Sequence, residues 1–169
     1  KNSTNVVNKT TKVNTLPSMD DVIGQEQAKR ALTIAIAGHH NILLTGPPGT
    51  GKTMLAQTAL GLLPDLTDQE VLEVSKIYGL TMNTSDIHYD RPFRSPHHTA
   101  SKISVVGGGP KAVPGEISLA HLGVLFLDEM PEYPRSVLES LRQPMEDKKI
   151  TITRVNRTST YPANFMLIA

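Results

Sequence analysis

Gly46-Pro47-Pro48-Gly49-Thr50-Gly51-Lys52-Thr53 lies between an apolar run at 41–45 and a run at 54–60 with the composition of a helix. The spacing G-x-x-x-x-G-K-T between a strand and a helix is typical of a loop that binds the phosphates of a nucleoside triphosphate. A glycine-rich loop alone would be weak support for this interpretation. The full octet in this context is strong support, and it predicts an α/β fold built around the loop.

The residue types of the octet each have a chemical reason. Glycines permit backbone turns that aim successive amide N–H groups at phosphates, and a helix that starts near Gly51 adds the positive end of its dipole. We expect Lys52 to reach the β- and γ-phosphates and the Thr53 hydroxyl to ligate Mg²⁺. The predicted cofactors are therefore ATP and Mg²⁺, with nucleotide contacts from Gly46, Pro47, Pro48, Gly49, Thr50, Gly51, Lys52, Thr53 and Met54.

A second signal follows at Val124-Leu125-Phe126-Leu127-Asp128-Glu129. Four apolar residues predict a buried strand, over 124–128, that carries the two carboxylates to the carboxyl edge of the sheet, where α/β proteins bind ligands. Asp128 would hold Mg²⁺, directly or through water, and Glu129 would polarise the attacking water as general base. A strand that simply enters a solvated turn is the alternative. Together with the octet, the pair predicts a catalytic site in which Lys52 and Glu129 act on ATP.

Composition excludes several other classes of function. The 169 residues contain no cysteine, which excludes disulfides, thiol catalysis and cysteine-ligated zinc. The net charge of +1 provides no global field for a polyanion, so any nucleic-acid contact must be local. No apolar stretch approaches the roughly 18 residues of a membrane span, and the N-terminus lacks the apolar core of a signal peptide. We expect a cytoplasmic protein without a membrane partner.

The first half of the chain predicts a linker followed by an α/β unit. Residues 1–18 are rich in Asn, Thr, Ser and Lys, without apolar periodicity, and we interpret them as a linker or a disordered cut end. The ordered domain is expected over 19–169. The expected elements are a helix over 27–37, a strand over 41–45, a helix over about 52–62, and an acidic helix over 67–77 with Val71, Leu72, Val74 and Ile77 facing inward.

The second half of the chain contains more residues that interrupt helices and strands. Proline and glycine exclude a long helix in the segment 80–118, so short strands and loops are expected there. A helix that starts at Pro134 should bury Val137, Leu138, Leu141 and Met145. Two β-branched runs, 150–154 and 158–161, predict a basic β-hairpin. Residues 165–169 begin another buried strand.

This order of motifs resembles the AAA+ ATPases, and within them the ComM/YifB branch of the magnesium-chelatase-like family. The octet, V-L-F-L-D-E and D-V-I-G-Q at 21–25 are general AAA+ features. The branch-specific motifs are R-P-F-R-S-P-H-H-T at 91–99, P-G-E-I-S-L-A-H at 114–121, L-R-Q-P-M-E at 141–146 and T-Y-P-A-N-F at 160–165. The resemblance implies a partial AAA+ core: a three-layer α/β/α P-loop NTPase sandwich with a mostly parallel sheet.

The resemblance also assigns places to individual segments. Val22 and Ile23 match the segment that packs on adenine, residues 80–118 match the helix-2 insertion, and 148–160 match the pre-sensor-1 β-hairpin. The family's strand order is 5-1-4-3-2. Its fifth strand, helical lid, sensor residues and arginine finger would lie past Ala169, so they are expected to be missing here.

For function, the resemblance implies a motor that assembles as a homo-hexameric ring. One hypothesis is a DNA translocase, a branch-migration helicase of natural transformation that acts on single-stranded or branched DNA. Its hairpin would project toward the pore and contact phosphates through Lys149, Arg154 and Arg157. The alternative is a chelatase-like motor that remodels a protein partner. A non-catalytic scaffold is disfavoured because Lys52 and Glu129 are both present.

Several residues leave alternatives open. The basic hairpin could be only a solvated face. His97-His98 and His39-His40 could suggest a metal site, but adjacent histidines without a third ligand rarely bind zinc. Structural hydrogen bonding or a nucleic-acid contact is the favoured interpretation of His97-His98. Phe93 could stack on bases or belong to the core.

Overall fold

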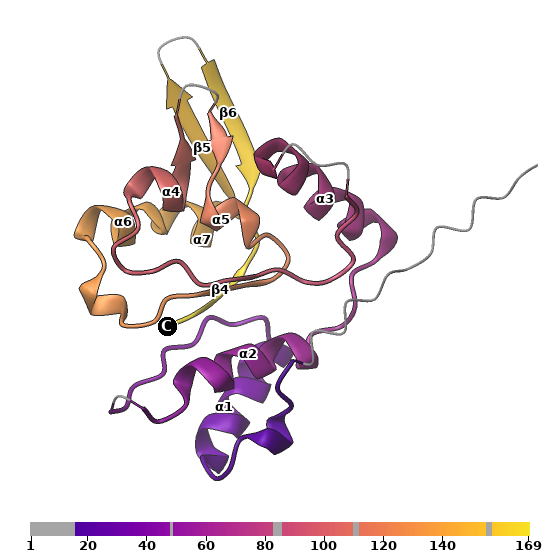
Figure 1. The fold of residues 1–169 in the computed structure, drawn as a ribbon, viewed down its shortest axis with the longest axis vertical. Helices are drawn as coiled ribbons and strands as arrows, with labels where there is room; N and C mark the ends of the chain where they lie inside the picture. Colours follow the sequence, from indigo (N-terminus) through magenta and orange to yellow (C-terminus); the bar gives the residue numbers. More distant parts are fainter. Residues whose placement is uncertain (1–15, 48, 83–85, 110–111, 155–156) are drawn as a thin grey trace, which may run out of the picture.

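The chain folds around a small parallel β-sheet with helices on both faces (Figure 1). The computed structural model describes residues 16–47, 49–82, 86–109, 112–154 and 157–169. Most of the predicted linker, residues 1–15, lies outside the described residues. The elements in chain order are η1 (Met19–Asp21), α1 (Glu26–Ala37), α2 (Lys52–Leu62), α3 (Asp68–Met82), β1 (Phe93–Arg94), α4 (Lys102–Val106), β2 (Gly107–Gly108), β3 (Val113–Pro114), α5 (Glu116–Leu119), β4 (Val124–Phe126), η2 (Met130–Glu132), α6 (Arg135–Ser140), α7 (Arg142–Asp147), β5 (Lys149–Arg154), β6 (Arg157–Pro162) and β7 (Met166–Ile168).

The central sheet has the order β1-β4-β7, and all of its pairs are parallel. The segment 41–44 extends the sheet beyond β7. Ile42 donates its backbone N–H to the Leu167 carbonyl at 2.9 Å, and Ala169 donates to the Ile42 carbonyl at 3.1 Å. In the family's numbering this is the order 1-4-3-2, so the expected arrangement is confirmed.

The expected strand over 41–45 is irregular in the structure, which assigns it only an isolated parallel bridge from Ile42 to Ile168. The prediction of a full strand was wrong in extent. Its outer edge has no partner among the described residues, and Leu43 is 65% exposed. In the part of the chain that the structure describes, the segment 41–45 pairs only with β7, and because β7 has three residues, it offers few backbone groups for a longer run of hydrogen bonds.

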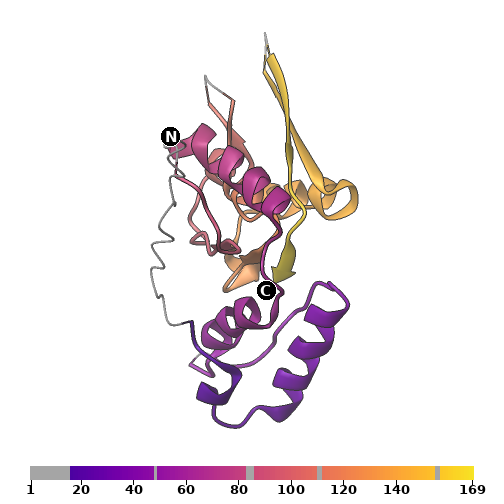
Figure 2. The ribbon, with the colours of Figure 1, turned by 90° about the vertical axis from the view of Figure 1, so that its right-hand side faces the viewer.

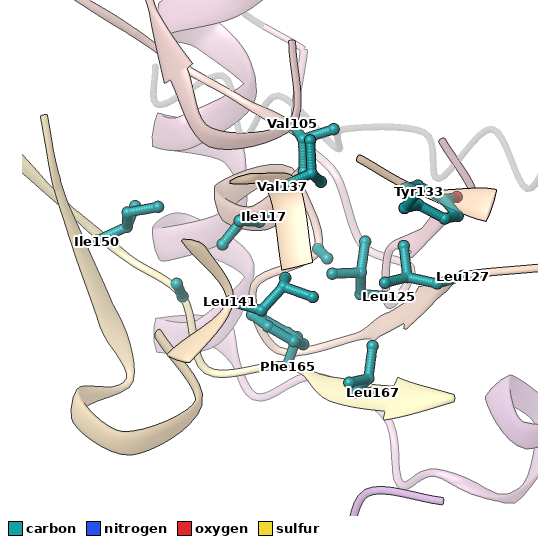
Figure 3. Packing of buried hydrophobic residues seen from close by; sticks show 12 residues of the cluster. Val105, Ile117, Leu125, Leu127, Tyr133, Val137, Leu141, Ile150, Phe165 and Leu167 are labelled. Atoms are coloured by element: carbon teal, nitrogen blue, oxygen red, sulfur yellow. The ribbon is translucent and has the colours of Figure 1, made fainter. Parts of the chain in front are cut away.

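Strand β4 explains the three layers, because both of its faces are apolar and buried. Val124 and Phe126 contact the layer of α1 and α2, and Leu125 contacts the opposite layer of α4 to α7. Successive side chains of a strand point to opposite faces, so an uninterrupted apolar run belongs to a strand that is covered on both sides. Figure 3 shows the cluster on the second face, where Leu125, Leu127 and Leu167 meet side chains from the helices and from β5.

Two expectations about helices were wrong in detail. Leu72 of α3 is 56% exposed, whereas Val71, Val74 and Ile77 are buried as predicted. The apolar stripe of this helix is one residue narrower than the sequence suggested. The helix expected from Pro134 is divided into α6 and α7 at Leu141, because Pro144 has no N–H to donate to the carbonyl of Ser140.

Two antiparallel hairpins extend from the same side of the domain (Figures 1 and 2). One is the β2–β3 pair inside the expected insertion, and the other is the β5–β6 pair, which confirms the predicted hairpin. The Tyr161 hydroxyl of β6 donates to the Ala112 carbonyl beside β3 at 2.7 Å. The base of the β5–β6 hairpin is therefore joined to the loop end of the β2–β3 hairpin.

His121 is a buried polar group that joins three segments of the fold. It is 4% exposed, its Nδ1 accepts a hydrogen bond from the Asn164 backbone N–H at 3.1 Å, and its Nε2 lies 3.3 Å from Glu73 Oε2 of α3. Only a neutral imidazole can accept at Nδ1. Burial lowers the pKa of His121, and the nearby Glu73 carboxylate partly opposes this effect.

We predict that the free energy of unfolding decreases as the pH falls through about 6.5, the ordinary histidine pKa. The folded state binds fewer protons at His121 than the unfolded state, so stability rises with pH in this range. Glu73→Gln removes the interaction that raises the pKa of His121 and should enlarge the stability lost in acid, toward a limit of about 1.4 kcal/mol for each added unit of pKa difference at a pH below both pKa values. Urea unfolding at pH 7.5 and 5.5 measures this.

His40→Asn, a change at an exposed histidine, is the control and should leave the pH dependence unchanged. If Glu73→Gln loses the same free energy of unfolding between pH 7.5 and 5.5 as the parent, the role assigned to His121 is contradicted.

Candidate nucleotide-binding site

A cavity of ≈ 920 Å³ lies at the carboxyl edge of the sheet, beside the N-terminus of α2. The predicted loop forms one wall, and the residues that follow β4 form the other. This is the position where open α/β sheets bind ligands. The lining residues are Leu43, Leu44, Thr45, Gly46, Gly49, Thr50, Gly51, Lys52, Thr53, Met54, His98, Phe126, Asp128, Glu129, Met130, Pro131, Glu132 and Ala169.

The loop has the backbone geometry that its glycines predict. Gly49 and Gly51 have φ values of 76° and 80°, a conformation that other residues rarely adopt. Gly51 is also the N-cap of α2, so the loop leads directly into the positive end of an eleven-residue helix. The Thr50 hydroxyl donates to the Pro47 carbonyl at 3.0 Å, and the Gln25 side chain donates to the Thr50 carbonyl. Pro48 lies outside the described residues.

Lys52 Nζ lies against the loop. It donates to the carbonyls of Gly46 at 2.9 Å and Pro47 at 3.0 Å. These two acceptors hold the ammonium group at the cavity wall, beside the N-terminal turn of α2. A phosphate in the cavity would meet this positive charge and the helix N-terminus together, which are the two features that bind anions most effectively.

Thr53 and Asp128 meet across the cavity although 75 positions separate them. The Thr53 hydroxyl donates to Asp128 Oδ2 at 3.3 Å. Among the described residues, no group of three or more His, Cys, Asp or Glu side chains could hold a metal ion by itself. Mg²⁺ prefers one or two protein oxygens completed by water and phosphates. The hydroxyl and the carboxylate therefore fit a magnesium ion that enters with a nucleotide.

Glu129 adopts a left-handed backbone conformation, with φ 52° and ψ 46°. Its backbone N–H donates to Asp128 Oδ1 at 3.0 Å, which fixes the Asp128 carboxylate relative to the turn that follows β4. The Glu129 side chain is 63% exposed and lines the cavity. The arrangement can bind a metal on one carboxylate while the other carboxylate stays free to accept a proton.

His98 also lines the cavity, and sequence reasoning missed this position. Its Nδ1 lies 3.6 Å from Glu129 Oε2. The feature that could have predicted this position is that His98 follows β1 by a few residues. Because β1 pairs in parallel with β4, residues that follow the two strands reach the same edge of the sheet. The His97 and His98 rings lie in contact, with centroids 4.1 Å apart and planes tilted by 34°, and His97 Nδ1 contacts the Thr99 hydroxyl at 2.8 Å. These contacts favour structural hydrogen bonding over metal ligation.

The residues expected to contact the nucleotide are not all at the cavity. Met54 lines it, whereas Val22 and Ile23 are absent from its described lining. Val22 is buried against α1 and α2, and Ile23 is 95% exposed one residue later. That Val22 and Ile23 contact adenine stays a prediction. It requires that the adenine base of a bound nucleotide extends out of this cavity toward them.

The residues expected to contact DNA are spread along the β5–β6 hairpin. Lys149 pairs with Pro162 at its base and is exposed, while Arg154 pairs with Arg157 at the opposite end. The length of β5 places the Lys149 and Arg154 backbones about 17 Å apart. The hairpin extends away from α2 and the loop before it (Figures 1 and 2). No helix among the described residues has the length and apolar character needed to cross a bilayer.

Comparisons with known proteins agree with the fold. The model of the family "Magnesium chelatase, subunit ChlI" matches residues 18–169. The chain is 56% identical to the competence protein ComM of Haemophilus influenzae over 158 residues, which cover 92% of this chain and 31% of that protein. It is also 56% identical to the uncharacterized protein YifB of Escherichia coli, over 89% of this chain and 30% of that one. The chain thus spans about a third of the length of these relatives.

A solved structure shows the same fold. The complex of the BchI and BchD subunits of magnesium chelatase contains a chain that superposes with a TM-score of 0.66 at 23% identity, covering 86% of this chain and 51% of that one. At this identity the likeness concerns the fold alone. The family match over residues 18–169 and the 56% identity to ComM and YifB show that this chain belongs to the ComM/YifB branch of the magnesium-chelatase-like family of AAA+ ATPases.

Proposed function

We propose that the chain is the motor core of a protein that binds and hydrolyses ATP with Mg²⁺. The observation that carries this proposal is the contact between Thr53 and Asp128 at 3.3 Å inside a cavity that Lys52 and Glu129 also line. Four side chains from two distant segments line this cavity, and their residue types are those that phosphoryl transfer uses, which supports the proposal.

Each side chain has a separate task in this proposal. Lys52 moves from the loop carbonyls to the β- and γ-phosphates, and the α2 N-terminus supports the same charge. Thr53 and Asp128 would hold Mg²⁺, which would neutralise charge on the transferred group. Glu129 orients water and accepts its proton. Its neighbouring Asp128 cannot take this task because the metal would occupy its oxygen.

Lys52→Ala should weaken ATP affinity. One charge-assisted contact contributes about 1.5–3 kcal/mol, so we expect Kd to rise about 10- to 100-fold. Titration of a fluorescent ATP analogue into the full chain measures this. Lys102→Ala, at an exposed lysine of α4, is the matched control and should bind as the parent does. Undiminished affinity in Lys52→Ala would remove the loop from the nucleotide site.

We further propose that the full protein is a homo-hexameric ring that moves along single-stranded or branched DNA. The relative named as a competence protein supports a role in natural transformation. The two hairpins support a mechanical role: they extend together from one side, and the Tyr161 contact with Ala112 joins them. Movement at the nucleotide site could then displace both hairpins as one unit.

The alternative is a motor that remodels a protein partner. The structure that supports it is the complex of two magnesium chelatase subunits, which shares this fold. In that case the same hairpins would contact a polypeptide, and ATP hydrolysis would not depend on DNA.

The ATPase rate of the full chain separates these functions. We expect single-stranded DNA or a branched duplex to stimulate turnover several-fold over the rate without polymer. Glu129→Gln is the blank, and it should bind ATP without hydrolysing it, since a positioned base contributes about 10²–10⁴-fold. Basal turnover without any stimulation would favour the protein-remodelling motor. Normal turnover in Glu129→Gln would remove Glu129 from the mechanism.

A second arm of this experiment tests the hairpin. Arg154→Ala with Arg157→Ala should weaken single-stranded DNA binding and reduce the slope of log affinity against log salt by about 1.4, because two phosphate contacts are lost. Arg30→Ala with Arg135→Ala removes the same charge at exposed helix positions and is the matched control. Equal slopes in the two double variants would mean that the hairpin does not contact phosphates.

A further inference from the structure

Gln25 has an unusual backbone conformation just before α1. Its φ and ψ are 58° and 38°, in the left-handed region that side chains other than glycine, asparagine and aspartate seldom adopt. Two contacts fix the residue there. Val22, three positions earlier, is buried against α1 and α2, and the Gln25 carbonyl accepts a hydrogen bond from the Lys29 N–H at 3.0 Å. Strained conformations of this kind concentrate at functional sites.

The Gln25 side chain contacts the phosphate-binding loop instead of its own helix. Gln25 is the N-cap of α1, yet its side chain makes no capping hydrogen bond. Its Nε2 donates to the Thr50 carbonyl, 25 positions away, and a Cβ atom built on Gly51 would lie 3.8 Å from the same Nε2. Thr50 and Gly51 line the nucleotide cavity, whereas Gln25 is absent from its described lining. The amide therefore holds the loop from its outer side.

This contact fixes the direction of one peptide group in the loop. A trans peptide is planar, and its N–H points opposite to its carbonyl. Because Gln25 holds the Thr50 carbonyl, the Gly51 N–H is directed away from Gln25. Among the described residues the Gly51 N–H has no acceptor, and Gly51 is the N-cap of α2. This N–H is therefore free to donate to a phosphate at the helix N-terminus.

We propose that Gln25 is a positioning residue for the phosphate-binding loop. By holding the Thr50 carbonyl on the outer side, its amide keeps the Gly51 N–H aimed at a phosphate before the nucleotide arrives. Binding then does not have to order this peptide group, and preorganisation of this kind raises affinity. Gln25 itself contacts neither the nucleotide nor Mg²⁺. The inference rests on the proposed nucleotide site, and it adds a support for the loop from a separate segment of the chain.

Two substitutions remove the hydrogen bond in different ways. Gln25→Met keeps the length of the side chain without a donor, and Gln25→Asn keeps the amide but places it one methylene short of Thr50. The loss of one neutral hydrogen bond should raise Kd about 2- to 10-fold in both. Displacement of a fluorescent ATP analogue from the full chain, by ATP and by inorganic tripolyphosphate, measures this. Gln27→Met and Gln27→Asn, at an exposed glutamine of α1, are the matched controls and should bind as the parent does.

Two readouts separate this role from others. Tripolyphosphate has no base, so it should lose affinity by the same factor as ATP if Gln25 acts through the loop. Urea unfolding of Gln25→Asn should give a free energy of unfolding no lower than that of the parent, because asparagine adopts the left-handed conformation more readily. Affinity should therefore fall in Gln25→Asn without a loss of stability, which a purely structural role does not allow.

Three results would overturn the inference. The first is parental affinity for both ligands in Gln25→Met and Gln25→Asn. The second is a loss for ATP but none for tripolyphosphate, which would place the effect at the base. The third is a loss of affinity in Gln25→Asn that accompanies an equal loss of unfolding free energy. Lys52→Ala is a separate check: if it weakens neither ligand, the proposed nucleotide site is itself rejected, and the inference with it.

Discussion

The parallel pairing of β4 with β1 and β7 is the constraint on which the rest of the structure depends. β4 is fully buried, with Val124 and Phe126 against one helical layer and Leu125 against the other. Full burial of one such side chain is worth about 1.5–3 kcal/mol. A shift of one residue would exchange the two faces and disturb both layers at once. The apolar run therefore fixes where Asp128 and Glu129 leave the sheet.

Because the sheet fixes the positions of Asp128 and Glu129, few further contacts are needed to build the site. The loop before α2 and the turn after β4 are far apart in sequence, yet the 41–44 segment, β7 and β4 lie in adjacent positions of one sheet. Thr53 and Asp128 are placed opposite each other by the sheet. The same geometry brings His98 in from β1. The hairpins lie on another side of the domain, away from α2 and the loop before it.

Much of this arrangement could be predicted from the sequence, because chemical motifs have strict spacing. The octet and the Asp128-Glu129 pair identified both walls of the cavity, and the apolar run predicted a strand covered on both faces. The strand order, in contrast, came from the family resemblance. The pairs His98–Glu129 and His121–Glu73 were not predicted, since each depends on which strands or helices become neighbours. Local patterns also misplaced Leu72, because apolar periodicity does not define how wide a buried stripe is, and missed the break that Pro144 causes in a helix.

In the proposed function, the sheet brings Thr53 and Asp128 together as one magnesium site. A double-mutant cycle with Thr53→Ala and Asp128→Asn in the full chain, read as ATP affinity with and without Mg²⁺, tests it most directly. The account predicts that each change weakens binding only when Mg²⁺ is present. It also predicts a coupling free energy within the range of about 0.5–3 kcal/mol that is typical of residues in contact. Additive losses, or losses that persist without Mg²⁺, would contradict the account.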